Sequence, residues 1–369
     1  MRFNKKFAQN IFKSFFQSIY KFIYGNIEGI IEAKTNSNPE KNLITKDHDA
    51  KYNIYKIKNG RLYTDRINDT AIILRKNIVN GPSFQFRIIK SQIVNVSVKE
   101  NIVFKKGTPR IKKKIKGKVL SLLTGGGGND NYWHWLFDVL PRLGICENKI
   151  DFNHIDFFLL PDNRRKFQSE TLKHLGIPMK KQISSVNFRH IVCDELYVTN
   201  HPVVMSENAT EDIQNIPKWI SEWLRKSFLK EISKKTFNKI YIDRGDSISN
   251  VSHLRSIINE SEIKSYLSTK GFKILRLGDH TFNEQVSIFN NADIIVGLHG
   301  AGFANVIFCK KNTKIIELRN ETAGKVIENL SLTNNLVYRP IICDQDKDGR
   351  LNQFGHIEVS INKLEEALK

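Results

Sequence analysis

Three segments of the sequence combine residue types that could bind an anion and activate a hydroxyl group. In the first, an expected buried strand ends at Val296 and the loop Gly297–Gly302 leads into a short helix. Small residues in such a loop let the backbone approach a ligand closely, and the free N–H groups at a helix start favour an anion. His299 adds a hydrogen-bond donor that can carry positive charge. The simpler alternative is a tight strand-to-helix turn that His299 only caps.

Two arginines form the second segment. Arg244 comes just after the expected strand Lys239–Ile242, and Arg255 follows it, with Asn259 and Glu260 further along. Because ligands of parallel sheets bind at the carboxyl ends of the strands, Arg244 has the position of a ligand-binding residue. Guanidinium groups bind phosphate with paired hydrogen bonds and keep their charge, which a departing nucleoside diphosphate needs. The alternative is a pair of surface arginines.

The third segment, Asn131–Leu143, is expected to be a helix that carries a histidine and an aspartate on one face. His134 and Asp138 are four residues apart, which places them one above the other. An aspartate beside a histidine orients the ring and supports its protonated form, so the pair could take the proton of an acceptor hydroxyl, with either residue as the base. Trp133 or Trp135 could stack on a sugar. The alternative is a buried His–Asp hydrogen bond with both tryptophans in the core.

Alternating strands and helices must position these segments. Strands are expected at Lys118–Leu123, Phe157–Leu160, Leu196–Thr199, Lys239–Ile242, Lys273–Leu277, Asp293–Val296 and Lys314–Leu318. Such alternation predicts an α/β protein, and two sets of it predict two Rossmann-like domains. We expect one domain at residues 51–230, with a small strand-rich region at 52–104, and a second domain at residues 231–369. An amphipathic helix and a linker are expected at residues 1–50.

The first 34 residues have the pattern of an amphipathic helix. Apolar residues recur every four positions from Phe3 to Ile31, beside a second row that starts at Phe12, and lysines supply positive charge. Such a helix can lie in the interface of an anionic membrane, although packing on the protein's own core is the alternative. The basic run at 105–118 is either a solvated loop or a surface for an acidic acceptor or lipid phosphates.

Composition limits the class of protein. The 369 residues carry a net charge of +20, which attracts polyanions or reflects a general bias toward lysine. A nucleic-acid-binding protein is one rival, but no recognised nucleic-acid-binding signature is present. No apolar run reaches the roughly 18 residues of a membrane span, and Lys13 and Lys21 interrupt what would be a secretory signal. The four cysteines are far apart, which favours a reducing, cytoplasmic location.

Taken together, the segments resemble glycosyltransferase family 61. The resemblance covers roughly residues 118–320 and rests on motifs in the family's order and spacing: Asn131–Leu143, Ile240–Arg244 with Arg255, Asn259 and Glu260, Gln285, and Gly297–Phe308 with Glu317. It implies a GT-B-like fold of two domains and an inverting, metal-independent transferase that uses a nucleotide sugar. The segment 344–349 has a DxD pattern and copies the start of a calcium loop, but a polar turn is the expected reading there, with no metal.

The resemblance also implies roles for individual residues. The catalytic residues would be His134 and Asp138, and the acceptor would contact Trp133, Trp135 and Arg142. The C-terminal domain would bind the donor, with Glu317 reaching the ribose hydroxyls or pairing with an arginine; its donor-binding residues would be Arg244, Arg255, His299, Gly300, Ala301, Gly302 and Glu317. The expected acceptor is a glycan or lipid-linked glycan of a growing capsular or related surface polysaccharide, at the inner face of the plasma membrane. The alternative is a non-catalytic polyanion- or nucleic-acid-binding protein on the same fold.

Overall fold

The computed structural model describes residues 5–35, 44–49, 52–64, 70–83, 85–90, 92–123, 131–162, 165–230, 237–245, 255–344 and 356–369. Its contacts divide the chain into two compact units. Unit 1 comprises residues 1–165 and 176–212, and unit 2 comprises residues 166–175 and 213–369. Unit 2 thus takes two helices from before the expected boundary at residue 230, because their residues pack within it. The ring of Phe228 lies 4.8 Å from that of Phe282, and Glu170 accepts the backbone N–H of Phe282.

Unit 1 is built around a mixed sheet. Its strands are β1 (Gly29–Ile31), β2 (Lys34–Thr35), β3 (Ile44–Asp49), β4 (Tyr52–Lys58), β5 (Arg61–Thr64), β6 (Thr70–Leu74), β7 (Asn77–Val79), β10 (Lys113–Ser121), β11 (Phe157–Leu160), β12 (Gln182–Ser184) and β13 (His190–Thr199), with β8 (Gln85–Ile89) and β9 (Gln92–Val96) as a separate hairpin. Its helices are α1 (Lys5–Tyr24), η1 (Val98–Glu100), α2 (Ile102–Lys106), α3 (Tyr132–His134), η2 (Trp135–Val139), α4 (Pro141–Cys146), η3 (Phe152–His154), η4 (Met179–Lys181) and α6 (Ala209–Asp212).

Strand β13 has a parallel neighbour on one edge and antiparallel neighbours on the other. Strands β10, β11 and β12 continue from it in parallel, as the α/β pattern predicts. On its other edge, β4 and β5 pair with it antiparallel. The expected strand-rich region at 52–104 therefore contains strands, but most of them extend the main sheet rather than forming a region of their own. For this reason unit 1 departs from an all-parallel Rossmann arrangement.

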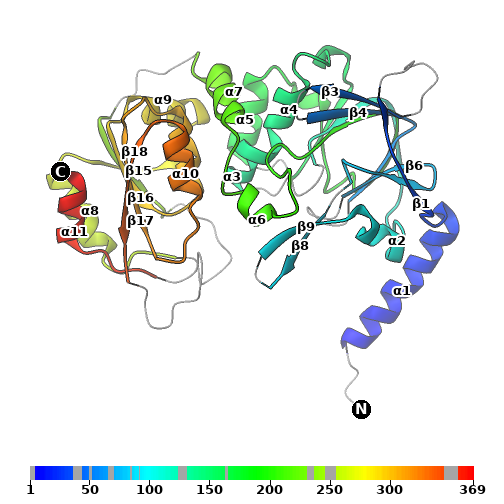
Figure 1. Cartoon of the computed structure of the whole chain (residues 1–369), viewed down its shortest axis with the longest axis horizontal. Coiled ribbons are helices and arrows are strands. Elements are labelled where there is room, and N and C mark those ends of the chain that lie inside the picture. Colours follow the sequence, from blue (N-terminus) through cyan, green and yellow to red (C-terminus); the bar gives the residue numbers. More distant parts are fainter. Residues whose placement is uncertain are drawn as a thin grey trace. The chain divides into compact units, whose positions relative to one another are not determined.

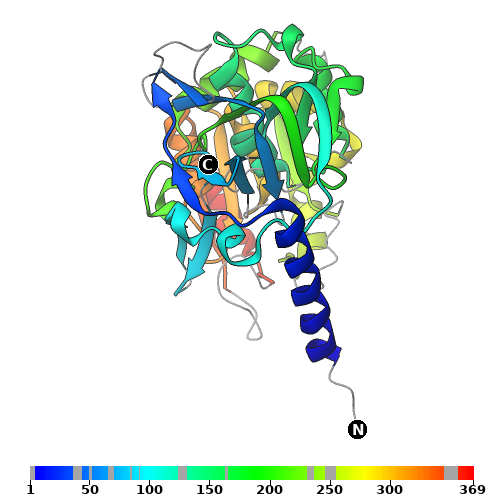
Figure 2. The same cartoon turned by 90° about the vertical axis from the view of Figure 1, so that its right-hand side faces the viewer.

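The amphipathic helix is present as α1, but it is shorter than its apolar pattern suggests. Gly25 ends it with a φ of +76°, and the N–H of Gly25 bonds to the carbonyl of Lys21 at 2.8 Å, a helix stop that glycine allows. The chain then enters strand β1. Figure 2 shows α1 running away from the sheet of unit 1. Among the described residues, none of the helices is long and apolar enough to cross a bilayer.

Unit 2 contains a five-stranded parallel sheet with the order β15-β14-β16-β17-β18. Helices cover both faces: α8 and α11 lie on one side, and α9 and α10 on the other (Figure 1). The elements are α5 (Lys166–His174), α7 (Lys218–Phe228), β14 (Lys239–Asp243), α8 (Glu260–Thr269), β15 (Lys273–Arg276), η5 (Leu277–Asp279), α9 (Phe282–Asn291), β16 (Ile294–Leu298), η6 (Ala301–Phe308), β17 (Lys314–Arg319), α10 (Val326–Thr333), β18 (Val337–Ile342) and α11 (Ile361–Leu368). The predicted strands and helices between residues 239 and 318 are confirmed within a few residues.

The strand order decides where unit 2 can bind a ligand. In chain order the five strands lie as 2-1-3-4-5, so the direction of winding reverses between β14 and β16. In such sheets the ligand crevice lies beyond the carboxyl ends of the two strands at the reversal. Arg244 follows β14 and His299 follows β16, so the reversal brings two of the predicted donor-binding residues to one place.

Candidate active site

The acceptor-side residues of unit 1 lie on an irregular helix. Asn131 begins it, because its side chain accepts the N–H of Trp133 at 2.8 Å. After α3 the backbone widens into a π-helical turn, in which the N–H of Leu140 bonds to the carbonyl of Trp135 at 3.0 Å. Single π-helical turns inside helices are frequent at functional sites. This π-helical turn begins directly after His134 and contains Asp138.

His134 and Asp138 form the expected pair. The Nδ1–H of His134 donates to Oδ2 of Asp138 at 2.5 Å, and the His134 side chain is 39% exposed, whereas Asp138 is 9% exposed. Burial alone would lower the pKa of His134, but the charge and hydrogen bond of Asp138 raise it above 6.5. Burial likewise opposes ionisation of Asp138, and His134 keeps the pKa of that carboxyl below 3.8. The imidazole of His134 is thus partly open to solvent, whereas the carboxylate of Asp138 is enclosed.

A second histidine, which the sequence did not reveal, faces the same carboxylate. His201 is 1% exposed, and its Nε2 lies 3.9 Å from Oδ1 of Asp138. Its Nδ1 accepts the backbone N–H groups of Val203 and Val204 at 3.1 and 2.9 Å. Burial lowers its pKa to about 3. The neutral ring therefore carries its proton on Nε2, toward Asp138.

Two of the three expected acceptor contacts have to be corrected. Trp135 and Arg142 are fully buried, so neither side chain is open to an acceptor. Arg142 bonds to the carbonyls of Asp138 and Asn200 at 2.9 and 3.0 Å. Burial lowers its pKa to about 9, although the charge of Asp138 opposes this shift. Arg142 therefore stabilises the helix around Asp138. Trp133 is half-buried, and its ring packs tilted against that of Phe137 with 4.6 Å between ring centres; it remains the candidate platform.

The residues of unit 2 that were predicted to bind the donor lie where the strand order reverses. Ile242 of β14 pairs with Gly297 of β16, so the loops after both strands are neighbours. The guanidinium of Arg244 donates to the carbonyl of His299 at 3.0 Å. A Cβ atom on Gly300 would lie 3.2 Å from Cζ of Arg244. A side chain at position 300 would thus crowd the Arg244 guanidinium, which lies against the backbone there, whereas the dihedral angles of Gly300 are open to any residue.

Glu317 connects His299 to a tyrosine on the neighbouring strand. Glu317 is fully buried; one of its oxygens accepts from Nδ1 of His299 and the other accepts the hydroxyl of Tyr338. Burial, followed by the charge of Glu317, raises the pKa of Tyr338. A carboxylate enclosed in this way orients His299 and does not reach a ribose, which corrects one expected role of Glu317. Tyr338 lies on strand β18, which is not among the strands expected from the sequence.

Further arginines add positive charge around this cluster. Burial, and then the neighbouring charge of Arg244, lower the pKa of Arg255 to about 10, while Glu317 acts in the opposite direction. Arg319, two residues after Glu317 on β17, is 6% exposed and interacts with Tyr338. Arg244 and Arg255 therefore lie close enough to repel each other, an arrangement that an anion between them would stabilise.

The helix η6 is held in place by an amide network. Asn305 donates to the side-chain oxygen of Gln285 at 3.1 Å, and Gln285 donates to the carbonyl of Leu277 at 2.8 Å. The first residue of η6 is Ala301, and a Cβ atom on Gly302 would lie 2.9 Å from Leu277. Gln285 and Gly302 thus serve close packing of η6 on its surroundings. Of the DxD segment 344–349, only Asp344 is among the described residues.

The structure thus places the predicted residues in two clusters. His134, Asp138 and Arg142 lie together in unit 1, and Arg244, Arg255, His299, Gly300 and Glu317 lie together in unit 2. His201 and Tyr338 are the additions that local sequence did not predict. A histidine bonded to an acidic side chain occurs in both clusters.

Comparison with known proteins agrees with this arrangement. Residues 132–316, half of the chain, match the family described as Glycosyltransferase 61. The EGF domain-specific O-linked N-acetylglucosamine transferase of Gallus gallus is 32% identical over 71 residues, which cover 18% of this chain and 13% of that relative. The matched range begins within the His134–Asp138 helix and ends in β17. The chain therefore belongs to glycosyltransferase family 61 and carries a glycosyltransferase domain.

Proposed function

We propose that the protein transfers a sugar from a nucleotide-sugar donor to a glycan acceptor, with inversion at the anomeric carbon. The observation that carries this proposal is the contact of Arg244 with the His299–Gly300 backbone at the strand-order reversal, close to Arg255. Two guanidinium groups and the start of η6 supply the positive field that a diphosphate requires.

In the donor half, Arg244 and Arg255 would bind the diphosphate and stabilise the charge that develops on it as the bond to the sugar breaks. With Nδ1–H directed to Glu317, His299 would donate to the diphosphate from Nε2 when its ring carries a proton on both nitrogens. Because Glu317 and Tyr338 are held by their own hydrogen bond, the ring of His299 is oriented before the donor arrives.

In the acceptor half, His134 would be the base. The acceptor oxygen attacks the anomeric carbon from the face opposite the diphosphate, the carbon–oxygen bond to the diphosphate breaks, and the hydroxyl proton passes to Nε2 of His134. Asp138 stabilises the resulting imidazolium through Nδ1. The enclosure of Asp138 by His134, His201 and Arg142 supports His134 rather than Asp138 in this role.

Several finer points belong to the same proposal. We propose that the reaction needs no metal, that the layout is GT-B-like, and that the product is a capsular or related surface polysaccharide on a glycan or lipid-linked glycan acceptor. All four cysteines are free thiols, which supports a reducing compartment, and we propose a location at the inner face of the plasma membrane. The name of the chicken relative makes N-acetylglucosamine one candidate sugar.

Thermal shift with UDP, GDP, CMP and dTDP tests the donor site. One of these nucleotides should raise the unfolding midpoint selectively, and Arg244→Ala combined with His299→Ala should abolish that shift. Arg339→Ala is the matched control, because it removes an exposed arginine from β18 and should leave the shift intact. A double variant that keeps both the shift and normal turnover would show that the donor site lies elsewhere.

A further inference from the structure

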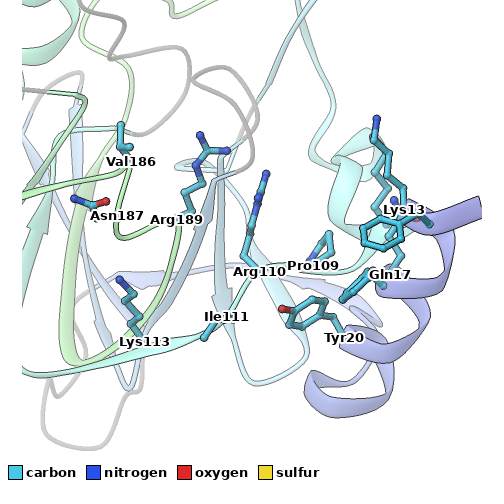
Figure 3. A pocket seen from close by; sticks show the side chains of 13 residues that line it. Lys13, Gln17, Tyr20, Pro109, Arg110, Ile111, Lys113, Val186, Asn187 and Arg189 are labelled. Carbon is cyan, nitrogen blue, oxygen red and sulfur yellow. The ribbon is translucent and has the colours of Figure 1, made fainter. Parts of the chain in front are cut away.

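A basic groove lies between α1 and two segments that are distant from it in sequence. It is open, with a volume of about 800 Å³, and it is lined by Phe12, Lys13, Phe16, Gln17, Tyr20, Lys106, Pro109, Arg110, Ile111, Lys113, Val186, Asn187 and Arg189. Figure 3 shows Arg110 and Arg189 on one side of this groove and Lys13 of α1 on the other. The groove therefore joins the amphipathic helix and the basic run at 105–118, which the sequence presented as separate features.

The C-terminal end of the helix is anchored to this basic segment. Lys21 donates to the carbonyl of Lys105 at 2.8 Å, and the Tyr24 hydroxyl accepts the N–H of Lys112 at 3.0 Å. The Tyr24 ring also packs edge-on against His190, with 5.1 Å between ring centres. These contacts set the direction in which α1 leaves unit 1.

Along its length, including the last turn, α1 exposes a large apolar surface. The exposed side chains are Phe7 at 65%, Ile11 at 56%, Phe12 at 65%, Phe15 at 62%, Phe22 at 92% and Ile23 at 58%. They follow one broad face of the helix. Phe12 and Phe16 also line the basic groove, so the aromatic face and the cationic groove are parts of one continuous surface.

The charge of this surface indicates its partner. Five cationic side chains and no carboxylate occur among the described residues that line the basic groove, and α1 itself contains no acidic residue. Aromatic rings next to lysine and arginine are suited to a bilayer interface, where the rings enter the acyl boundary and the cations meet lipid phosphates.

We propose that the basic groove and the aromatic face of α1 together bind the anionic lipid headgroups of a membrane surface. Lys13, Arg110 and Arg189 contact the phosphates, while Phe12 and Phe15 enter the interface. This inference rests on the proposed function, because it assigns the surface by which a transferase would bind the membrane. Its test measures vesicle binding and does not depend on sugar transfer.

Co-sedimentation of the full chain with vesicles tests the proposal. Binding should require phosphatidylglycerol in phosphatidylcholine vesicles and should weaken as salt screens the charges. Lys13→Gln, Arg110→Gln and Arg189→Gln together should weaken binding about 100-fold, since each cation near an anionic surface contributes roughly fivefold. The control triple Lys180→Gln, Lys310→Gln and Lys311→Gln makes the same change in net charge at exposed positions outside the groove and should bind nearly as the parent does.

Other outcomes would overturn the proposal. An equal loss of vesicle binding in both triple variants would mean that net charge alone drives binding. Unchanged vesicle binding by the Phe12→Ser/Phe15→Ser variant would mean that the aromatic face of α1 does not take part. Inorganic phosphate that displaces the protein at low concentration would indicate a free-anion site instead. Tighter binding to an arbitrary oligonucleotide, or dimers in sedimentation velocity that are lost in the aromatic variant, would identify a different occupant. The groove variant should retain the nucleotide thermal shift, so failure here leaves the transferase proposal standing.

Discussion

The Nε2 atom of His201 lies 3.9 Å from Oδ1 of Asp138, although the two residues come from different elements of unit 1. Two backbone N–H groups occupy the other nitrogen of His201 and so set its tautomer. Asp138 is thereby placed between one neutral histidine and one histidine that can accept a proton. This is the arrangement expected of a positioned base.

We expect His201→Gln to lower kcat on the order of tenfold, as for outer partners of other oriented histidines, with the donor KM unchanged. The neutral His201 directs its Nε2–H toward Asp138 and so weakens the hold of that carboxylate on the His134 proton. Its loss should strengthen that hold and move the acid limb of the pH–rate profile, which the pKa of His134 sets, to higher pH. The control is His174→Gln, which affects a ring bonded to the Ser227 carbonyl. A fall in kcat with no movement of the limb would indicate a structural role only.

His134→Ala should reduce kcat by about 10²- to 10⁴-fold while sparing nucleotide binding. A base acts when neutral, so activity should rise with pH through the pKa of His134, which Asp138 holds above 6.5. In Asp138→Asn the negative charge that raises the pKa of His134 is lost, while burial of His134 still lowers it. The pKa of His134 should therefore fall, and this limb should move to lower pH. The measurement is kcat/KM against pH for both variants, and a limb that stays in place in Asp138→Asn would argue against the pair.

Gly300→Ala should weaken nucleotide binding by about tenfold, because the added methyl group would lie 3.2 Å from the Arg244 guanidinium and displace it. Gly324→Ala is a matched control, since the nearest atom to its added methyl group is 4.0 Å away. Titration calorimetry with the nucleotide that stabilises the parent compares them. Equal affinity in both variants would mean that the position of Arg244 is unimportant for the donor.

Glu317→Ala should lower the free energy of unfolding by about 3–5 kcal/mol, because it leaves the buried partners of a charged group unsatisfied. Tyr338→Phe removes one hydrogen bond to that carboxylate and should cost about 1–3 kcal/mol. Tyr266→Phe provides the comparison, because its buried hydroxyl has no partner among the described residues and its loss should be close to neutral. Denaturant unfolding measures all three, and a neutral Tyr338→Phe would contradict the orienting role of Glu317.

Chelation with EDTA should leave turnover unchanged, since the proposed charge stabilisation comes from Arg244 and Arg255 rather than from a metal. The assay compares initial rates before and after EDTA treatment and after addition of magnesium. Loss of activity that magnesium restores would require a metal-dependent mechanism and would bring the DxD segment at 344–349 back into consideration.

Much of the arrangement could be predicted because its signals are local. Apolar periodicity located α1 and the strands from β14 to β17, and glycine and histidine after a buried strand marked the loop at 297–302. Since parallel strands carry ligands at their carboxyl ends, the positions of Arg244 and His299 followed from the same pattern. The His134–Asp138 pair followed from helical spacing, which local backbone geometry imposes even through a π-helical turn.

The features that only the tertiary structure determined arise from contacts between segments that are distant in the sequence. The antiparallel strands β4 and β5 join β13 through register that composition does not encode, and packing encloses Trp135 and Arg142 together with the whole segment between them. His201 meets Asp138, and Tyr338 meets Glu317, across elements whose separation in sequence carries no period. The basic groove likewise exists only because α1, the segment at 106–113 and the segment at 186–189 converge. Sequence periodicity reports which face of an element is apolar, but which elements meet is set by the packing of the whole chain.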